Sequence, residues 1–584
     1  MGENANIKAK ETPLEGPRTD AENVLYLDFQ GRVNDFVSKL LGDYIPNVYK
    51  HTKVIHDPVW GTMMFYPWEL QIIDSPLLQR LRKINQVGLA VLTYPSAHHS
   101  RFEHTLGVVS VVTRMVNNIN QERVEEEYAS ENKVITNDDL FKLRLAALLH
   151  DVGHCFFSHL SETIYGKLTP FVDLKDSFNI FSGAKEHEIF AYIIVNCPRF
   201  REFFRKNIEY PYTIDDSFFE DIGRMIVGAF IEPNEKPSKA SIPVKKYYLT
   251  QMINGQFDAD KLDYLRRDSY TAGLALTYDI ERFLYKIRIV DKHESVNGGV
   301  VIGKHLTIPM TGVSAVEEMA FSQLMLASYI YQHQKVLATD ALIQDVAEGL
   351  SKNGKLKHPC DYLYYCDDDI YQIYDSSADK DFKRTISQKN VNSMSSKTLS
   401  DIVKRVRTRE LPKRAFTINF NTVSEIHAQE KSKYRVADIA DTLRGIKELR
   451  QEICAEAQRI SNILPEQEGG NKVIDIYDIH VSIPKTSIAK DLNNAFVVTN
   501  DNEIVPLSEI VRLSDWADAF SYHKWNAYIF SRSDIIPIVS IASKTVFERH
   551  GLKFDREKIF RGLKEEKLIV AMLKNLIDNY SYTV

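Results

Sequence analysis

The stretch that decides the fold is Leu143–Glu162, LRLAALLHDVGHCFFSHLSE. Apolar residues recur at helical spacing in its first half, which predicts a buried helix whose final turns carry the polar groups that follow. The final turns are expected to carry His150, Asp151 and His154, and His159 and Glu162 follow just beyond them. Burying ionisable groups costs free energy unless a metal ion or a hydrogen-bond network satisfies them. The stretch therefore predicts a polar centre beside a helical core.

The bulk composition describes a globular chain of 584 residues with 44% hydrophobic content and a net charge of -6. This charge excludes a global basic field that would attract nucleic acid or an acidic membrane surface. Five cysteines without a CxxC pair favour reduced thiols and argue against a structural zinc cluster. No run approaches the roughly 18 apolar residues of a membrane span. We expect a cytoplasmic protein without a membrane partner.

The pattern of elements predicts a mainly α fold with a helical catalytic core, small β-hairpins and a C-terminal α+β lobe. We expect a flexible N-terminal segment with a short helix at 1–45, a catalytic domain at 46–345 and a regulatory or oligomerisation lobe at 346–584. The lobe is expected because strand-like segments at 414–421, 473–484 and 495–507 alternate with a helix at 442–463. Within the catalytic domain we expect two strands around Gly61, a hairpin at 296–309, and helices at 76–88, 186–196, 253–267 and 315–350.

One histidine, a later His-Asp pair and a distant aspartate are enough to bind a divalent metal and leave positions open for water and a phosphate. His104, His150, Asp151 and Asp260 form such a set. Spacing alone is weak support, because 17 histidines and 79 acidic residues produce many such sets by chance. A single histidine taken alone is more often a hydrogen-bonded core residue.

Three blocks carry a resemblance to a known family: HSRFEHTLGV at 99–108, ALLHDVGHCFFSH at 147–159 and DADKLDYLRRDSYTAG at 258–273. They resemble the HD-domain deoxynucleoside triphosphate triphosphohydrolases, which include bacterial dGTPase-like enzymes and the vertebrate sterile-alpha-motif HD-domain dNTPases. The similarity runs with gaps from about 53 to 336. Many phosphohydrolases share the H…HD…D set, whereas the SRFEH and DKxDY blocks are specific to this branch.

The resemblance implies metal-dependent hydrolysis of dNTPs to deoxynucleoside and inorganic triphosphate. It assigns the divalent ion to His104, His150, Asp151 and Asp260, with Mg²⁺ or Mn²⁺ expected first and Fe²⁺ or Zn²⁺ as alternatives.

The same resemblance assigns the acid and base groups. It makes His159 the proton donor to the leaving ribose oxygen and places His154 and His187 along the α-phosphate. Glu162 stands where the family usually has an aspartate, and it would form a dyad with His187.

The resemblance also assigns a substrate-binding set: Gln86, Arg101, Lys261, Tyr264, Asp268, Tyr331 and Gln332. Arg101 and Lys261 would contact phosphates, and Tyr264, Asp268 and Gln86 would contact the sugar and its 3′-hydroxyl. Tyr331 would stack below the sugar and exclude a 2′-hydroxyl, although by itself it is more typical of helix packing. Where the family generally has an arginine for the terminal phosphate, this chain has Gln323.

A second nucleotide site is implied by Lys53, Asp74, Gln79 and Arg82. These match positions that bind an activating guanine nucleotide at a subunit interface, so GTP or a dNTP would activate a homo-dimer or homo-tetramer. The alternative interpretation is that Asp74 and Arg82 are a helix cap and a surface charge.

Two other functions stay open from the residues. The first is an HD phosphohydrolase that acts on another nucleotide, a second messenger or a nucleic-acid end, and Gln323 is the feature that favours it. The second is a nucleotide-sensing or single-stranded nucleic-acid-binding scaffold, because aromatic and basic residues interleave at 518–532, DAFSYHKWNAYIFSR. Such a stripe is more often part of a core or an interface.

Overall fold

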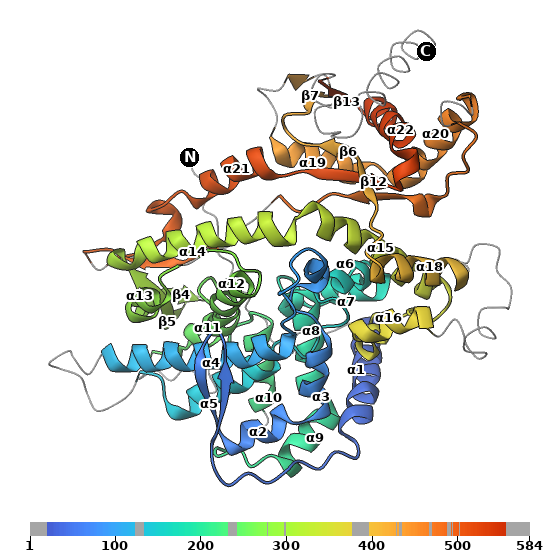
Figure 1. The fold of residues 1–584 in the computed structure, drawn as a ribbon. Helices are drawn as coiled ribbons and strands as arrows, with labels where there is room; N and C mark the ends of the chain where they lie inside the picture. Colours follow the sequence, from blue (N-terminus) through green and yellow to red (C-terminus); the bar gives the residue numbers. More distant parts are fainter. Residues whose placement is uncertain are drawn as a thin grey trace. The chain divides into compact units, whose positions relative to one another are not determined.

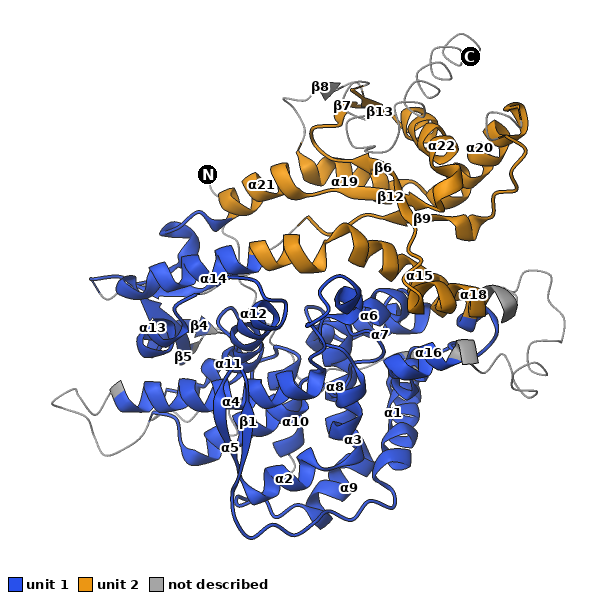
Figure 2. Cartoon of the chain, viewed as in Figure 1, with its two compact units in different colours: residues 1–323, 350–372, 491–513 blue, residues 324–349, 373–490, 514–584 orange. Residues whose placement is uncertain are grey.

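The computed structural model describes residues 20–122, 134–215, 217–231, 242–276, 278–296, 299–375, 396–427, 429–430, 435–465, 470–486, 492, 494–501 and 503–555 (Figure 1). The chain forms two compact units (Figure 2). Unit 1 comprises 1–323, 350–372 and 491–513, and unit 2 comprises 324–349, 373–490 and 514–584. The units are therefore interleaved along the sequence, whereas a single boundary at 345 was expected. The N-terminal part of the expected flexible segment, 1–19, lies outside the described residues.

Unit 1 is mainly helical. Its helices are α1 (Asp20–Leu41), α2 (Pro67–Ile73), α3 (Pro76–Gln79), α4 (Arg101–Glu122), α5 (Asn137–Leu149), α6 (His159–Tyr165), α7 (Thr169–Ser177), α8 (Glu186–Asn196), α9 (Pro198–Asn207), α10 (Phe218–Ile226), α11 (Tyr247–Ile253), α12 (Ala259–Thr271) and α13 (Ile280–Lys286). Two further helices, α14 (Val313–Leu326) and α16 (Asp367–Asp375), run from unit 1 into unit 2. Helix α8 has the bounds that the sequence predicted.

The core of unit 1 forms where α4 and α5 pack on each other and on α10, α11 and α12 (Figure 1). Side chains of α5 from Leu143 to Leu149 are buried, and α8 is buried along its whole length. Burying one such leucine contributes about 1.5–3 kcal/mol. This packing fixes the end of α5, from which the first polar residues of the site follow.

Two small sheets complete unit 1. Strands β1 (Lys53–Asp57) and β2 (Gly61–Phe65) form the hairpin expected around Gly61. The other sheet has the order β11-β10-β5-β3, with β4 (Arg288–Val296) paired to β5 (Gly299–Pro309). Its remaining strands are β3 (Val244–Lys245), β10 (Phe496–Val498) and β11 (Ile504–Pro506). The hairpin expected at 296–309 is thus present, but its first strand begins earlier, at Arg288.

Three expected helices are shorter or broken. The helix expected at 76–88 stops at Gln79 and continues as a 3-10 turn, Arg80–Lys83, because the Arg80 guanidinium turns inward and donates to the Val152 carbonyl (2.7 Å). The helix expected at 315–350 is interrupted by a π-helical turn at Ala327–Tyr331 before α15 (Gln334–Lys352) begins. The helix expected at 442–463 is two helices, α19 (Val436–Gly445) and α20 (Leu449–Ile463), separated at Glu448, whose φ is 57°.

Unit 2 has α+β structure, as expected for the C-terminal lobe. Strands β6 (Lys413–Ile418), β12 (Ala527–Ser531) and β9 (Ile479–Ser482) form one sheet, and β13 (Leu552–Phe554), β7 (Val423–Ile426) and β8 (Gln429–Glu430) form another. Helices α20 and α22 (Ile536–Arg549) pack together beside β6. The other helices of this unit are α18 (Ser396–Arg407) and α21 (Leu513–Lys524).

The aromatic stripe at 518–532 is divided between surface and core. Strand β12 lies between β6 and β9, and its side chains, including Tyr528 and Phe530, are buried. Trp525 is buried as well, and its indole donates to the Pro484 carbonyl (3.1 Å). Only the α21 part, with Tyr522 39% exposed, offers an accessible ring. These contacts explain half of the stripe as core packing rather than as a base-stacking surface.

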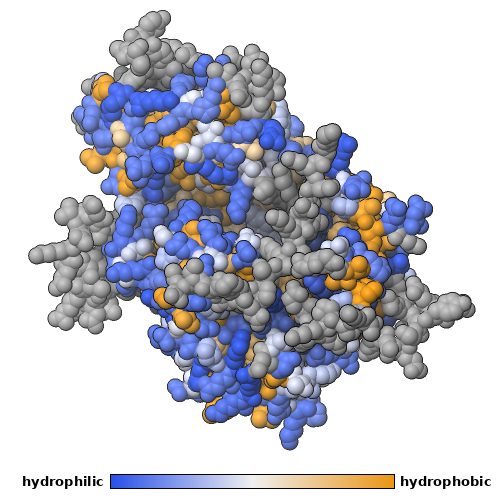
Figure 3. Space-filling model, turned by 180° about the vertical axis from the view of Figure 1, so that it is seen from behind, coloured by the Kyte–Doolittle hydropathy of each residue, from blue (hydrophilic) through white to orange (hydrophobic). Residues whose placement is uncertain are grey.

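The surface is mainly hydrophilic on the face shown in Figure 3, where hydrophobic residues form separate groups. Over the part of the chain that the structure describes, no helix combines the length and the apolar character needed to cross a bilayer.

Asp221 on α10 provides a pH-dependent test of the fold of unit 1. Burial raises the pKa of this carboxyl to about 6, although Lys142 lies 3.9 Å away and opposes the shift. In the unfolded chain, Asp221 ionises near its ordinary pKa. The free energy of unfolding therefore falls as the pH rises from 4 to 6, and the loss stays constant at higher pH. We expect Asp221→Asn to stabilise the protein above pH 6, by up to about 3 kcal/mol, and to have little effect near pH 4. Thermal unfolding against pH measures this.

The matched control is Asp138→Asn, which removes the more exposed carboxylate that pairs with the same Lys142 (3.5 Å). A surface pair of this kind contributes about 0–1 kcal/mol, so the control should show little pH-dependent gain. Equal gains in both variants would contradict the role of burial.

Candidate active site

His150, Asp151 and His154 occupy a turn between two helices, and His159 and Glu162 lie on the second of these helices, α6. Helix α5 ends at Leu149, His150 is its C-cap, and α6 begins only at His159. The prediction that the final turns of the helix carry Asp151 and His154 was therefore wrong, because the helix ends before them. Phe157 and Ser158 have φ of 50° and 54°, a strained backbone that is typical of functional sites.

The turn is held by contacts from distant parts of unit 1. The Asp367 carboxylate accepts the Phe157 N–H (2.6 Å), and the Ser158 hydroxyl donates to the Asn85 carbonyl (2.6 Å). Gly153 allows close packing on α8, because a Cβ at this position would lie 2.0 Å from the His187 carbonyl oxygen. The turn is thus fixed against the helix that supplies His187.

The four predicted metal ligands converge from three segments of unit 1. His104 lies on α4, His150 and Asp151 lie in the turn, and Asp260 lies on the first turn of α12. The ligand atoms of His104, His150 and Asp260 lie within 4.8 Å of one another. His104 Nε2 is 3.0 Å from Asp260 Oδ1 and 3.7 Å from Asp151 Oδ2, and His150 Nε2 is 3.3 Å from Asp151 Oδ1.

The two histidines of this cluster present the same ring nitrogen to the carboxylates. His104 Nδ1 donates to Asp263 Oδ2 (2.7 Å) and His150 Nδ1 donates to the Ala147 carbonyl (2.8 Å), since both partners can only accept. Both Nε2 atoms are buried and face carboxylate oxygens. Two imidazoles whose Nδ1 protons are engaged elsewhere, and whose Nε2 atoms point toward two carboxylates, form a set that fits a divalent cation.

The charges of this cluster are tightly coupled. Burial opposes protonation of His104, but the carboxylates of Asp260 and Asp263 outweigh it and raise the pKa of His104 to about 10. Burial likewise opposes ionisation of Asp151, but Arg101 and the neighbouring histidines hold its pKa well below the ordinary value. A divalent cation would displace the His104 proton and compete with Arg101 for Asp151.

The sequence did not identify the residues that support His104. Asp263 accepts from Arg267 Nε (2.8 Å), and Arg267 Nη1 in turn donates to Asp57 (2.8 Å) on β1. All three side chains are buried. The sequence pattern that could have indicated these residues is the i, i+4 spacing of Asp263 and Arg267. This spacing is also common on exposed helix faces, so it does not identify a buried pair.

A second cluster lies next to the first and contains the four predicted acid and base residues. His187 Nδ1 (2.9 Å) and His159 Nδ1 (3.1 Å) donate to Glu162 Oε1, and His154 Nδ1 lies 3.0 Å from the same oxygen. The rings of His154 and His187 stack with centroids 3.8 Å apart. Asp151 Oδ1 lies 3.2 Å from His154 Nε2, so this aspartate joins the two clusters.

The four residues differ in exposure and charge. His154 and His187 are buried, whereas 60% of the His159 side chain is exposed. Burial and the Arg101 cation lower the pKa of His154 to about 3, so this ring is neutral near pH 7. Burial also disfavours the imidazolium of His187, but the Glu162 carboxylate outweighs it and raises the pKa of His187. The cluster therefore combines a neutral ring (His154), a ring whose protonation the Glu162 carboxylate favours (His187) and an accessible ring (His159).

Both clusters lie within one matched segment: residues 101–265 match the HD domain family. This segment is therefore similar to an HD domain, and the name HD domain is used for it. The four predicted metal ligands and the four predicted acid and base residues all fall inside it.

Curated relatives extend the similarity beyond the HD domain. An uncharacterized protein of Methanocaldococcus jannaschii is 29% identical over 293 residues, which are 50% of this chain and 48% of the relative. Deoxynucleoside triphosphate triphosphohydrolase SAMHD1 of Bos taurus is 28% identical over 303 residues, 50% of this chain and 46% of the relative. The protein of the same name from Danio rerio is 30% identical over 293 residues, 48% and 42% of the two chains. The chain spans about half the length of these relatives, and the resemblance to the HD-domain triphosphohydrolases is confirmed.

The predicted phosphate contacts are part of the HD domain's own salt-bridge network. Arg101 is buried, and its guanidinium donates to Asp151 Oδ2 (3.0 Å) and to the Ser158 hydroxyl (2.9 Å). Lys261 Nζ donates to Asp258 Oδ2 (2.7 Å) and to a backbone carbonyl. A phosphate of the substrate would have to replace these carboxylates as the partner of Arg101 and Lys261. Phosphate binding by the two side chains therefore stays a prediction.

The predicted sugar contacts lie in two groups. Asp268 pairs with His99 Nε2 (2.7 Å), whose backbone carbonyl accepts the Gln86 N–H (3.0 Å). Gln86 Oε1 is buried and has no hydrogen-bond partner in the described part of the chain. His99 was missed as a partner, although it opens the HSRFEH block. In the other group, the Gln323 amide donates to the Tyr264 hydroxyl (3.2 Å).

Tyr331 and Gln332 belong to unit 2. Tyr331 ends the π-helical turn that follows α14, and Gln332 Nε2 donates to the Lys485 carbonyl (3.0 Å) within the same unit. Their predicted contact with the substrate stays a prediction.

The four residues of the predicted second nucleotide site form two neighbouring pairs. Lys53 Nζ lies over the Tyr49 ring (4.1 Å to its centroid), and the hydroxyl of the same tyrosine donates to Asp74. Arg82 Nε donates to Gln79 Oε1 (2.8 Å), and its guanidinium covers Phe102. These contacts satisfy the side chains without a ligand, so nucleotide binding at this site also stays a prediction.

Proposed function

We propose that this chain hydrolyses deoxynucleoside triphosphates to deoxynucleoside and inorganic triphosphate in a reaction that requires a divalent metal. The observation that carries the proposal is that Asp151 joins a His/Asp cluster to a cluster of three histidines and a glutamate, of which His159 is exposed. Such an arrangement supports a metal site next to general acid and base groups. The names of the SAMHD1 relatives supply the substrate class.

The metal would be held by His104, His150, Asp151 and Asp260. Mg²⁺ or Mn²⁺ is expected first, with Fe²⁺ or Zn²⁺ as alternatives for this mixed imidazole and carboxylate set. When bound, the ion supplies charge neutralisation at a phosphate oxygen and a water of lowered pKa.

The second cluster would handle protons. Glu162 fixes His187 and His159 through their Nδ1 protons, which directs the opposite nitrogen of each ring away from the carboxylate. His159 is the exposed member and is suited to donate a proton to the leaving ribose oxygen. Neutral His154, stacked on His187, would accept or donate one hydrogen bond beside the α-phosphate without adding charge.

The remaining predicted residues would position the substrate. Arg101 and Lys261 would hold phosphate oxygens, with Arg101 offering a planar fork of donors. Gln86 and Asp268 would hold the 3′-hydroxyl, since one is a buried amide and the other a buried carboxylate. Within unit 1, Tyr264 would complete the contacts with the sugar.

The test is product identity. Purified chain is incubated with each dNTP and each NTP in the presence of Mg²⁺ or Mn²⁺, with and without GTP, and the products are separated by anion exchange. The proposal expects deoxynucleoside and inorganic triphosphate. Formation of dNMP and pyrophosphate, or no turnover of any dNTP by chain with a loaded metal site, would contradict it.

Activation by a nucleotide and assembly into a dimer or tetramer are further parts of the proposal. Lys53, Asp74, Gln79 and Arg82 offer cations and a carboxylate suited to phosphates and to a guanine edge. GTP should then raise turnover and the assembly state together, as measured by activity and light scattering on the same sample. If GTP raised neither turnover nor the assembly state, the proposed activation would be wrong, but the proposed hydrolysis would not be affected.

A second candidate is hydrolysis of a nucleotide with a shorter phosphate chain. It is favoured by Gln323, which presents a neutral amide beside Tyr264 where the resembled family generally has an arginine. We expect Gln323→Arg to lower the KM for dNTPs by roughly 10-fold with little change in kcat, because a charged donor near the terminal phosphate adds about 1.5–3 kcal/mol of binding. Gln323→Glu is the control and should raise the KM. Improved hydrolysis of dNDPs but not of dNTPs would favour the second candidate.

A further inference from the structure

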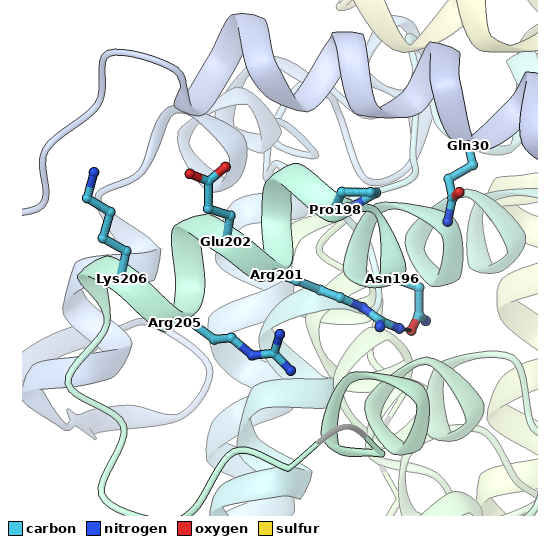
Figure 4. Close-up of a pocket in the computed structure, with 7 residues that line it drawn as sticks. All are labelled: Gln30, Asn196, Pro198, Arg201, Glu202, Arg205 and Lys206. Atoms are coloured by element: carbon cyan, nitrogen blue, oxygen red, sulfur yellow. Dashed lines mark hydrogen bonds between the residues drawn. The ribbon is translucent and has the colours of Figure 1, made fainter.

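A pocket of about 640 Å³ on unit 1 is lined by residues of α1, α8 and α9 (Figure 4). Its arginines already have partners. Arg201 donates to the Asn196 amide oxygen. The Cζ atoms of Arg201 and Arg205 lie 5.5 Å and 5.4 Å from the centroid of the Phe219 ring. These contacts account for both side chains without a ligand.

A buried carboxylate outside the two clusters, that of Asp367, bridges two segments of unit 1. Asp367 is the first residue of α16 and is 4% exposed. Its Oδ1 accepts the Phe157 N–H (2.6 Å), and its Oδ2 accepts the Asn85 N–H (2.9 Å). Burial raises the pKa of this carboxyl to about 7, although the backbone N–H groups oppose the shift. A buried carboxylate held by neutral donors costs stability, which indicates a role beyond stabilising the fold.

One of the two segments is the turn between α5 and α6. His154 precedes Phe157 in this turn, and His159 follows it. The Nδ1 atoms of both histidines lie 3.0 Å and 3.1 Å from the same oxygen of Glu162. The chain therefore has to fold back between them, and it does so through positive φ values at Phe157 and Ser158. Residues other than glycine keep such a conformation only where the surrounding structure holds it.

The segment around Asp367 supplies this support. The Phe157 ring packs edge-on against Tyr371, with centroids 5.5 Å apart. The Phe156 ring stacks on Tyr362, with centroids 5.7 Å apart. These ring contacts fix side chains of the turn, whereas the Asp367 carboxylate fixes a backbone N–H of the turn. The conformation of the turn therefore depends on a segment that lies about two hundred residues further along the chain.

The other segment carries Gln86, which is predicted to contact the sugar. The residue before it, Asn85, donates its N–H to Asp367, and its carbonyl accepts the Ser158 hydroxyl (2.6 Å). Together with the hydrogen bond from Phe157, these contacts close a ring that holds the turn against this segment. The position of the acid and base residues relative to Gln86 is therefore fixed through Asp367.

We propose that Asp367 is a positioning residue of the active site, which holds the turn with the acid and base residues against the segment that carries Gln86. The inference rests on the proposed hydrolysis of dNTPs and adds a residue to it. Proton transfer depends steeply on the distance and direction between donor and acceptor. A displaced turn therefore lowers kcat more than it weakens the binding of the substrate.

The test is the steady-state kinetics of Asp367→Asn at pH 8, where the parent carboxyl is ionised. Asparagine has one acceptor oxygen instead of two and turns its own N–H toward one of the two backbone donors, so one end of the bridge opens. We expect kcat for dNTPs to fall by at least about 10-fold, with the KM within about threefold of the parent value. Asp367→Glu retains both acceptors and should recover part of the lost kcat.

Asp369→Asn is the matched control. The Asp369 carboxylate lies on the same helix and accepts the Cys366 N–H (2.7 Å) at its start, but it is not part of the bridge. This variant should keep kcat and KM near the parent values, and thermal unfolding of both variants shows whether their stability is comparable. Equal losses of kcat in Asp367→Asn and Asp369→Asn at comparable stability would make Asp367 a structural residue only.

Hydrogen exchange gives a second readout that does not need turnover. In Asp367→Asn, the peptide covering 155–160 or the peptide covering 84–88 should exchange faster than in the parent, because one backbone N–H loses its acceptor. Asp369→Asn should leave both peptides unchanged. Unchanged exchange in both peptides of Asp367→Asn, or an unchanged kcat, would overturn the inference. If the parent forms no deoxynucleoside from any dNTP, the proposed function is wrong, and the exchange rates still decide whether Asp367 holds the turn.

Discussion

Replacing Asp151 with asparagine is expected to reduce dNTP hydrolysis by roughly a thousandfold or more and to release the bound metal. Asp151 touches both clusters: its Oδ1 lies 3.3 Å from His150 Nε2 and 3.2 Å from His154 Nε2. Asparagine keeps the shape but loses the negative charge, so the metal site would retain one carboxylate instead of two. Activity and metal content per chain, measured by elemental analysis, should fall together.

The variant also leaves the buried Arg101 without its anionic partner, which lies 3.0 Å away in the parent. Breaking such a pair costs about 3–5 kcal/mol, so thermal unfolding has to be followed alongside activity. Asp138→Asn, a carboxylate on the surface of α5, serves as the control and should change none of the three readouts. A folded Asp151→Asn chain that kept both its metal and its turnover would remove Asp151 from the site.

The composition of this site could be predicted from the sequence, but its local geometry could not. His104, His150, Asp151 and Asp260 were assigned from three short blocks, and the structure brings them together. The blocks do not reveal that the helix ends at Leu149, because the apolar spacing continues through Val152. The turn depends on Asp367, more than two hundred residues away, which accepts the Phe157 N–H. No local pattern could contain that contact.

The supporting residues were missed for the same physical reason. Asp57 on β1 and Arg267 on α12 form a buried ion pair across 210 positions, and this pair orients Asp263 behind His104. In the sequence, nothing distinguishes Arg267 from the other basic residues of predicted helices, because its partner Asp57 is far away along the chain. Similarly, the short strand β10 (Phe496–Val498) pairs in parallel with β5, so that residues 491–513 belong to unit 1, although the sequence predicted them to be part of the C-terminal lobe.

Replacing Glu162 with glutamine is expected to reduce turnover by about a hundredfold while the metal stays bound. Glu162 Oε1 is the common partner of His187 and His159 and lies 3.0 Å from His154 Nδ1, so its charge holds three rings in place. Burial opposes ionisation, but these histidines hold the pKa of Glu162 well below its ordinary value, and the carboxylate is charged throughout the neutral range. A neutral amide keeps an acceptor there but removes the negative charge that raises the pKa of His187.

Glu162→Asp is the informative companion, because it restores the residue that the resembled family usually has at this position. The aspartate is one methylene shorter, whereas the present contacts of 2.9–3.1 Å are made with the longer side chain. We therefore expect Glu162→Asp to retain the charge but loosen these contacts, with kcat between the parent and Glu162→Gln and KM nearly unchanged. Metal content should equal that of the parent in both variants. Loss of metal from Glu162→Gln would mean that the second cluster supports the metal site rather than proton transfer.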